Sequence, residues 1–241
     1  MKILKDYAFN VPQSITASSQ NTNFPVSNLY LLDPGVVWRA GDFTGDTDIV
    51  IDFGAAVDID NVWLCAANFI ECTIQANSTN SWDSPAVTKT VTLAKDAVGI
   101  LKGFFVLSAP QYRYVRLLIN QQALLFGTAP QLGNIIIGKA YEQPVAELAV
   151  SYEEMWLRFE SDGGAHTKAR KGRGRHIIDI TITGPEAEVS AARFSDCELM
   201  VVYTDLSSVA DSYLVYAPER GRIVKRSPLE AEVSYTLEER T

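Results

Sequence analysis

The chain has 241 residues, of which 47% are hydrophobic and 21% charged; these values are near the globular average and exclude disorder, collagen and coiled coil as the main class. A formal net charge of −8 argues against broad nucleic-acid binding, because that needs a dominant basic surface. No apolar stretch reaches the ~18–20 residues of a membrane helix, and residues 1–6 lack the apolar core of a secretory signal.

Residues that usually carry enzyme chemistry are sparse. The three cysteines are too few for a disulfide framework, and we interpret Cys65 and Cys72 as buried thiols, which fits synthesis in a reducing cytosol. The two histidines, His166 and His176, belong to no zinc-binding pattern, and there is no GxSxG, Walker or GxGxxG motif after a strand. The sequence therefore predicts neither an enzyme nor a cofactor.

The first part of the chain is predicted to be irregular. Asn, Ser, Thr, Pro and Asp are dense over residues 12–46, which favours turns and loops. One or two helical turns are expected at 27–32, with Ser27 as the N-cap.

From residue 47 the pattern indicates strands. Ile49, Ile51 and Phe53 alternate with polar residues and share one face, and Gly54 is expected to end this strand. Further short runs rich in β-branched and aromatic residues lie at 62–67, 72–76, 89–93, 104–107, 112–119 and 134–141. Such spacing favours a β-sandwich or barrel.

Pro144 marks the expected boundary between domains 1–143 and 144–241. In the second domain we expect a long exposed loop over the basic, glycine-rich stretch 161–175, and a short helix from Pro185 to about Ser195. Strands are expected at 154–159, 178–183, 198–204, 213–216 and 231–238. The predicted fold class is all-β, with an N-terminal sandwich and a smaller β-rich domain.

The first half resembles a discoidin-like (galactose-binding-like) jelly-roll β-sandwich. The matching pieces, in order, are SITASS at 14–19, FPVSNL at 24–29, VWRA at 37–40, DIVIDFG at 48–54, VDIDNV at 57–62, RYVRL at 113–117 and IIIG at 135–138. Members of this family often bind sugars or lipids, and many carry two terminal cysteines that bridge the sandwich. That cysteine pair is absent here.

The FPVSNL start and the Trp38-Arg39 pair are also similar to domains of bacteriophage tail proteins. GRHIIDI at 174–180, Gly221 and the closing strand near 237–239 resemble the ring-forming split β-barrel of phage distal tail proteins. In that family the barrel usually precedes the accessory sandwich, whereas here the order is reversed. One hypothesis is that the first dozen residues of this chain return to the second domain.

The phage resemblance implies a virion protein of the tail tip, assembled in the host cytoplasm. The resemblance implies that it forms a homo-oligomeric ring with six-fold symmetry, a hexamer, that joins the tail tube protein to tail-tip hub proteins. The alternative is an adhesion protein whose N-terminal sandwich recognises a host-surface carbohydrate. A third class, a hydrolase, would need a pair of carboxylates about 5–9.5 Å apart in a cleft.

The most distinctive charge feature is a set of five cations with glycines between them: Lys168, Arg170, Lys171, Arg173 and Arg175. On an acidic chain they would give charge complementarity between identical subunits, which makes them candidate subunit-interface residues. A position facing the tube lumen and a solvated, mobile loop are the alternatives.

Three residues are candidates for ligand binding, namely Trp38, Arg39 and Trp82. Aromatic faces and planar guanidinium groups suit sugar rings and their hydroxyls. The alternative for Trp38 and Arg39 is a core tryptophan beside an arginine paired with an aspartate, and for Trp82 it is a ring folded back onto the sandwich.

Asp42, Asp46 and Asp48 form a weak calcium candidate. The EF-hand pattern is not met, because the glutamate at its twelfth position is missing. Aspartates also accumulate in turns without metal, because their side chains cap the local backbone.

Overall fold

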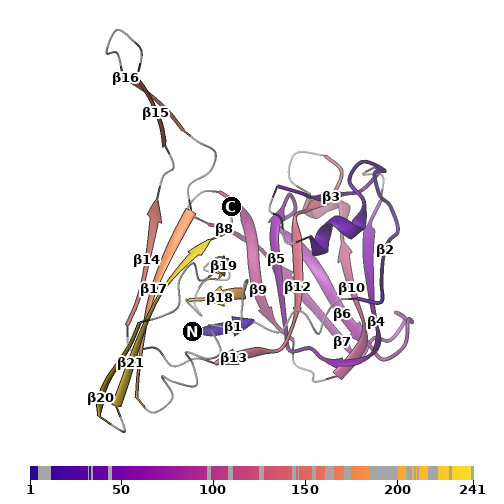
Figure 1. Ribbon diagram of the computed structural model, residues 1–241. Coiled ribbons are helices and arrows are strands. Elements are labelled where there is room, and N and C mark those ends of the chain that lie inside the picture. The colour runs from indigo at the N-terminus through magenta and orange to yellow at the C-terminus, as the bar shows by residue number, and fades with distance from the viewer. Residues whose placement is uncertain are drawn as a thin grey trace. The chain divides into compact units, whose positions relative to one another are not determined.

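The computed structural model describes residues 1–4, 12–31, 33, 35–42, 45–96, 99–107, 111–124, 128–142, 145, 147–153, 156–160, 166–170, 175–184, 200–204, 208, 210, 212–216, 222–227 and 230–239 (Figure 1). The chain divides into two compact units. The sandwich unit comprises Lys2–Glu142 and Val201–Ser212, and the C-terminal unit comprises Met1, Gln143–Met200 and Tyr213–Thr241. The predicted boundary after residue 143 lies next to this division, whereas residues 201–212 group with the sandwich.

Two antiparallel sheets make up the sandwich (Figure 1). The five-stranded sheet has the order β2 (Ser14–Ala17), β4 (Thr47–Asp58), β10 (Gln111–Ile119), β6 (Glu71–Asn77) and β7 (Val87–Thr92). The four-stranded sheet has the order β12 (Asn134–Gly138), β5 (Asn61–Ala67), β9 (Leu101–Val106) and β8 (Ala94–Lys95). A short pair, β3 (Trp38–Arg39) and β11 (Gln131–Leu132), accompanies them.

Alternation along the strands sends one set of side chains into a shared core. Ile49, Ile51 and Leu117 from the five-stranded sheet are fully buried, as are Leu64 and Ile135 from the four-stranded sheet. Each such aliphatic side chain stabilises the fold by about 1.5–3 kcal/mol through burial. The predicted inward face of the strand at 47–53 is thus confirmed.

Gly54 does not end that strand. β4 continues through Gly54 to Asp58, and Gly54 has a φ of +78°. A Cβ atom there would lie 2.6 Å from the side-chain oxygen of the exposed Gln13, which can move away, so the positive φ is what favours glycine at this position. Glycine here marks a local irregularity within a strand rather than its end.

The start of the chain is not irregular. β1 (Lys2–Leu4) pairs with β13 (Ala140–Glu142) on one side and with β18 (Met200–Tyr203) on the other. Residues 2–4 therefore pair with residues 201–203, which come from the second half of the sequence but group with the sandwich unit. The run predicted at 134–141 is two strands, β12 and β13.

The four-stranded sheet also buries side chains on the face opposite the core. Ile136, Trp63 and Phe104 occupy one row across β12, β5 and β9, and all are at most 2% exposed. The Trp63 indole N–H donates to the buried Ser212 hydroxyl, with 3.1 Å between Nε1 and Oγ. The segment 201–212 thus contributes to the packing of the sandwich unit.

In the C-terminal unit, antiparallel strands form the order β19 (Ser212–Tyr216), β21 (Glu230–Glu239), β17 (Arg175–Gly184) and β14 (Glu147–Glu153), with β20 (Arg222–Ser227) also on β21. The predicted alternation of Ile178, Ile180 and Ile182 is confirmed, because all three are buried in β17. A separate two-stranded ribbon consists of β15 (Trp156–Glu160) and β16 (His166–Arg170).

The described residues contain only two helical turns, both 3₁₀: η2 (Val26–Tyr30) and η3 (Gln121–Ala123). The turn predicted at 27–32 is therefore present, but Pro25 precedes it and Ser27 is not its cap. The helix predicted from Pro185 lies outside the described residues. No described helix is long and apolar enough to cross a membrane. The predicted all-β fold class with an N-terminal sandwich is confirmed.

Candidate functional site

Trp38 and Arg39 sit next to each other on β3 but have different environments. The Trp38 side chain is 0% exposed and belongs to the sandwich core, so its ring has no open face. Arg39 is half-buried and points the other way. Its partner is Gln131 rather than an aspartate, with 2.8 Å between Nη2 and Oε1.

Arg39 is the centre of a group that we call the Arg39 cluster, formed by Phe24, Arg39, Asn68, Thr128 and Gln131. The Arg39 guanidinium carbon lies 4.7 Å from the centroid of the Phe24 ring, a cation–π distance. The Asn68 amide donates to the Thr128 hydroxyl at 3.1 Å and accepts from the Gln131 backbone N–H at 2.8 Å. Phe24 and Gln131 therefore contact the planar cation directly, and Asn68 links the Gln131 backbone to Thr128.

Strained backbone lies beside this cluster. Ala66 has a φ of +58°, a left-handed conformation that is unfavourable for a residue with a Cβ atom. It follows Cys65 at the irregularity in the pairing of β5 with β9, two residues before Asn68. A Cβ on Gly133 would lie 2.7 Å from the Ala66 Cβ, so this close approach also requires glycine. Strain of this kind is concentrated at functional sites.

The chemistry of the Arg39 cluster is that of recognition. A guanidinium, two side-chain amides and a hydroxyl supply hydrogen-bond donors and acceptors, and Phe24 supplies a half-buried aromatic ring. The cluster contains no carboxylate, thiol or imidazole, so it has no general acid or base. Sequence reasoning found Arg39 but not Asn68 or Gln131, because they are distant in the sequence and belong to no motif.

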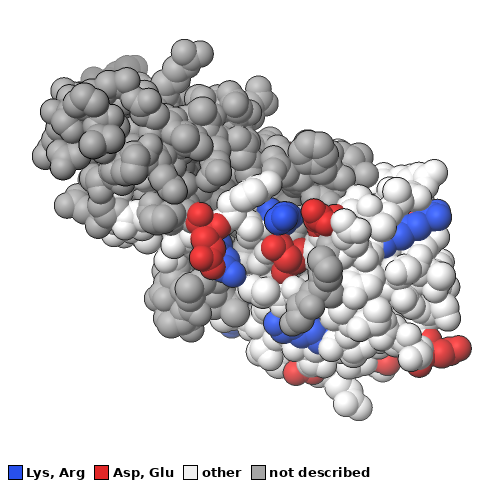
Figure 2. Space-filling view, turned by 90° about the horizontal axis from the view of Figure 1, so that it is seen from below, with Lys and Arg blue, Asp and Glu red and all other residues white. Residues whose placement is uncertain are grey.

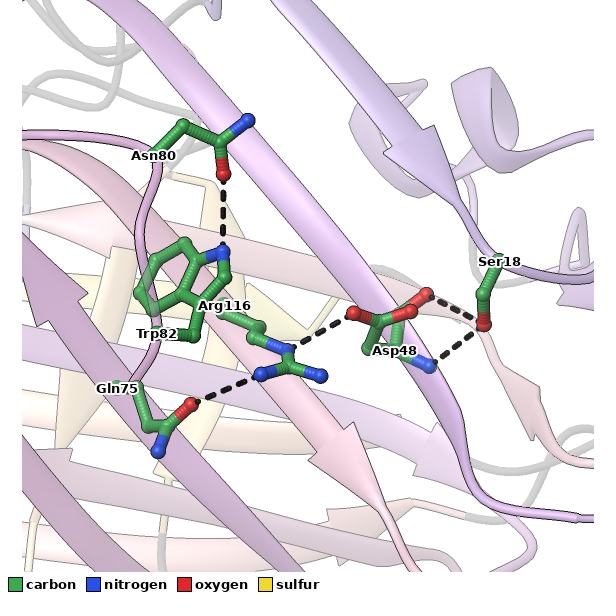
Figure 3. A network of polar contacts seen from close by, with 6 residues as sticks. All are labelled: Ser18, Asp48, Gln75, Asn80, Trp82 and Arg116. Atoms are coloured by element: carbon green, nitrogen blue, oxygen red, sulfur yellow. Dashed lines mark hydrogen bonds and ion pairs between the residues drawn. The ribbon is translucent and has the colours of Figure 1, made fainter. Parts of the chain in front are cut away.

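Trp82 lies in a different place, above the outer face of the five-stranded sheet (Figure 3). The Arg116 guanidinium carbon is 5.7 Å from the centroid of its indole ring. Arg116 forms an ion pair with Asp48, with 2.8 Å between Nε and Oδ2, and donates from Nη1 to Gln75 at 3.4 Å. The indole N–H donates to Asn80 within the same loop at 2.9 Å.

A second arginine belongs to the same face. Arg113 donates to both carboxylate oxygens of Asp52, at 2.8 and 2.9 Å, and its guanidinium carbon is 4.9 Å from the Tyr114 ring centroid. Strict alternation along residues 112–119 would place the side chains of Arg113 and Tyr114 on opposite faces of the sheet. A β-bulge between Tyr112 and Tyr114 brings Arg113 to Asp52 instead. These hydrogen bonds from Arg113 hold the pKa of Asp52 below its usual value.

The calcium candidates have other partners. Asp48 is paired with Arg116, and the Asp46 carboxylate accepts from the Gln121 backbone N–H at 3.1 Å. Asp42 is exposed. No group of three or more His, Cys, Asp or Glu side chains that could hold a metal ion occurs in the described part of the chain.

The basic stretch is not one long loop. Lys168 and Arg170 lie in β16, and Arg175 begins β17, where it forms an ion pair with Glu238. Lys171 and Arg173 lie outside the described residues. The alternation of Thr167 and Ala169 with basic residues permits a strand, and pairing with β15 supplies its hydrogen bonds.

Charged side chains of both signs lie next to one another on the face shown in Figure 2, and most of the described surface there is uncharged. This face therefore offers no broad basic patch. Cys72 is buried in the sandwich core, as predicted, and burial raises the pKa of its thiol to about 12. Cys65 is half-buried, and Cys197 lies outside the described residues.

No family model and no curated protein matches this chain. Among solved structures, chitosan-binding module 1 from a chitosanase/glucanase of Paenibacillus sp. IK-5 is 19% identical, with a TM-score of 0.43 over 54% of this chain and 98% of the module. The family 32 carbohydrate-binding module of Clostridium perfringens NanJ, in complex with galactose, is 12% identical, with a TM-score of 0.44 over 58% of this chain and 100% of the module. Both are carbohydrate-binding modules, and neither is a phage tail protein.

Proposed function

We propose that the protein binds carbohydrate through its N-terminal sandwich, at the Arg39 cluster. The observation that carries this proposal is the Arg39 guanidinium, which lies against Phe24 and is oriented by Gln131. A guanidinium fixed in this way loses little rotamer freedom when it donates to vicinal sugar hydroxyls. The half-buried Asn68 and Gln131 amides add donors and acceptors beside it.

Binding is the whole of this function, and it requires no catalytic step. The hydrogen bonds within the cluster hold its side chains in place before the ligand arrives, which lowers the entropy lost on binding. In the adhesion hypothesis, the ligand is a glycan on the host-cell surface.

The test begins with the full chain on a glycan array, followed by calorimetry with the sugars that bind. Arg39→Lys keeps the charge but loses the planar fork, and we expect it to weaken binding at least about tenfold, equal to about 1.4 kcal/mol. Tyr141→Ala, which removes an exposed aromatic ring on β13, is the matched control and should bind like the wild type. Unchanged affinity in Arg39→Lys would contradict the assignment of this site.

A ring-forming structural role at a phage tail tip is the second candidate. The observation that favours it is the ribbon of β15 and β16, whose register pairs Arg158 with Lys168 and Trp156 with Arg170. Residues that pair across a ribbon share a face of it, so this register places three basic positions, Arg158, Lys168 and Arg170, on one face, together with the Glu160–His166 pair. On a chain of net charge −8, such a face suits a second copy of the same chain.

This candidate includes the tail tube and tail-tip hub partners and the virion location that the sequence resemblance implies. Light scattering over a concentration series, with negative-stain images of the same samples, tests it. We expect rings that Lys168→Glu with Arg170→Glu dissociates, whereas Lys139→Glu, an exposed charge change on the sandwich unit, leaves them intact. A strict monomer at every concentration would oppose self-assembly.

A further inference from the structure

The outer face of the five-stranded sheet carries two similar sets of side chains, which together we call the sheet-face patch. One set is Asp48, Arg116 and Trp82, and the other is Asp52, Arg113 and Tyr114. In each set an aspartate on β4 pairs with an arginine on β10, and an aromatic ring lies against that arginine. Trp82 comes from the loop after β6 (Figure 3).

The sheet-face patch has no net charge. Both ion pairs have a nitrogen–oxygen distance of 2.8 Å, so each arginine is neutralised by its own aspartate. A strongly charged partner such as a nucleic acid or an acidic glycan gains little from such a surface. Uncharged polar side chains lie on the neighbouring strands of this face, where Thr73 and Thr90 face each other across β6 and β7 with 3.3 Å between their hydroxyl oxygens.

The aromatic and guanidinium groups are held in place before any ligand arrives. The Asn80 side chain fixes the Trp82 indole, and Asp48 and Gln75 fix the Arg116 guanidinium. In Figure 3, one guanidinium nitrogen of Arg116 contacts Asp48, a second contacts Gln75, and the third makes no contact with the residues drawn. The Trp82 side chain is half-exposed, which leaves part of an oriented ring in contact with solvent.

Spacing along β10 separates the two sets. Tyr114 and Arg116 are two residues apart on one face, a distance of about 7 Å along the strand. A ligand made of units that repeat at a similar distance would contact one set of aromatic ring and arginine with one unit and the other set with another unit. An oligosaccharide chain has this character, since each unit presents hydroxyls at its edge and C–H groups on its face.

We propose that the sheet-face patch is a second contact surface, which binds an uncharged oligosaccharide chain of two or more units. The proposal rests on the proposed function for the class of ligand, but it concerns different residues from the Arg39 cluster. Trp82 and Tyr114 stack on successive sugar units, and Arg116 and Gln75 bind hydroxyl groups. The sheet-face patch adds affinity for long chains, which a single sugar does not gain.

The experiment titrates the full chain with neutral oligosaccharides of glucose, galactose and N-acetylglucosamine, from one to six units, and with hyaluronate as an acidic chain. Calorimetry compares the wild type with Trp82→Ala and Arg39→Lys, and Tyr141→Ala is the matched exposed-aromatic control. Circular dichroism verifies that each variant is folded. We expect affinity to rise at least about tenfold with chain length in the wild type and the control, and this rise to be lost in Trp82→Ala.

The outcomes separate the two proposals. Length-dependent binding that Trp82→Ala abolishes supports the sheet-face patch, whether or not Arg39→Lys also weakens it. Binding that is independent of length and unchanged in Trp82→Ala overturns the patch while the Arg39 cluster stands. Preference for hyaluronate that disappears in salt overturns the assignment to an uncharged ligand, and absence of all carbohydrate binding overturns both proposals.

Discussion

Replacing Ser212 by alanine tests whether the segment 201–212 is part of the sandwich. The Ser212 hydroxyl is fully buried and accepts the indole N–H of Trp63, which is itself 1% exposed. Ser212→Ala leaves a buried donor without this acceptor, and an unsatisfied buried polar group costs about 1–3 kcal/mol. We therefore expect the free energy of unfolding to fall by that amount.

Urea unfolding followed by circular dichroism measures this loss, and a double-mutant cycle with Trp63→Phe isolates the hydrogen bond. In the Trp63→Phe background the donor is gone, so Ser212→Ala should cost about 1 kcal/mol less than in the wild type. Ser81→Ala, at an exposed loop serine, is the control and should change stability by less than about 0.5 kcal/mol. Equal effects of Ser212→Ala in both backgrounds would refute the packing of this segment on β5.

Three further predictions concern charge and ionisation. Lys102→Met removes the buried cation 3.1 Å from Asp96, and urea unfolding should show a loss of about 3–5 kcal/mol. Burial raises the pKa of Cys72 in the folded protein to about 12, above the ordinary value of 9.0, so the neutral thiol stabilises the fold fully below pH 9 and less as the pH rises toward 12. The free energy of unfolding should therefore fall by about 1.4 kcal/mol per pH unit between pH 9 and 11, and Cys72→Ala should remove this fall from the unfolding curves. The hydrogen bonds from Arg113 lower the pKa of Asp52, so this pair stabilises the fold fully above pH 4 and less as the pH falls further. The difference in the free energy of unfolding between the wild type and Arg113→Gln should therefore be smaller at pH 3 than at pH 6.

The sequence by itself determined the parts that depend on local pattern. Ile49 and Ile51 in β4, and Ile178 and Ile180 in β17, alternate with polar residues, and this period alone defines a strand and its buried face. The predicted strands match the observed ones within a few residues, because turn-forming residues separate them. The sequence pattern did not predict β14, β16 or β20. The composition of β16, which is rich in lysine and arginine and flanked by glycines, is also typical of a loop.

Only the tertiary structure decided which residues meet. Arg39 finds Gln131, and Trp63 finds Ser212, through contacts between segments far apart in the sequence, and no periodicity encodes such partners. The bulge that turns Arg113 toward Asp52 likewise depends on the pairing of β10 with β4. Binding surfaces are built from these long-range contacts because a site needs several chemical groups at one place, whereas a strand needs only an alternation of neighbours.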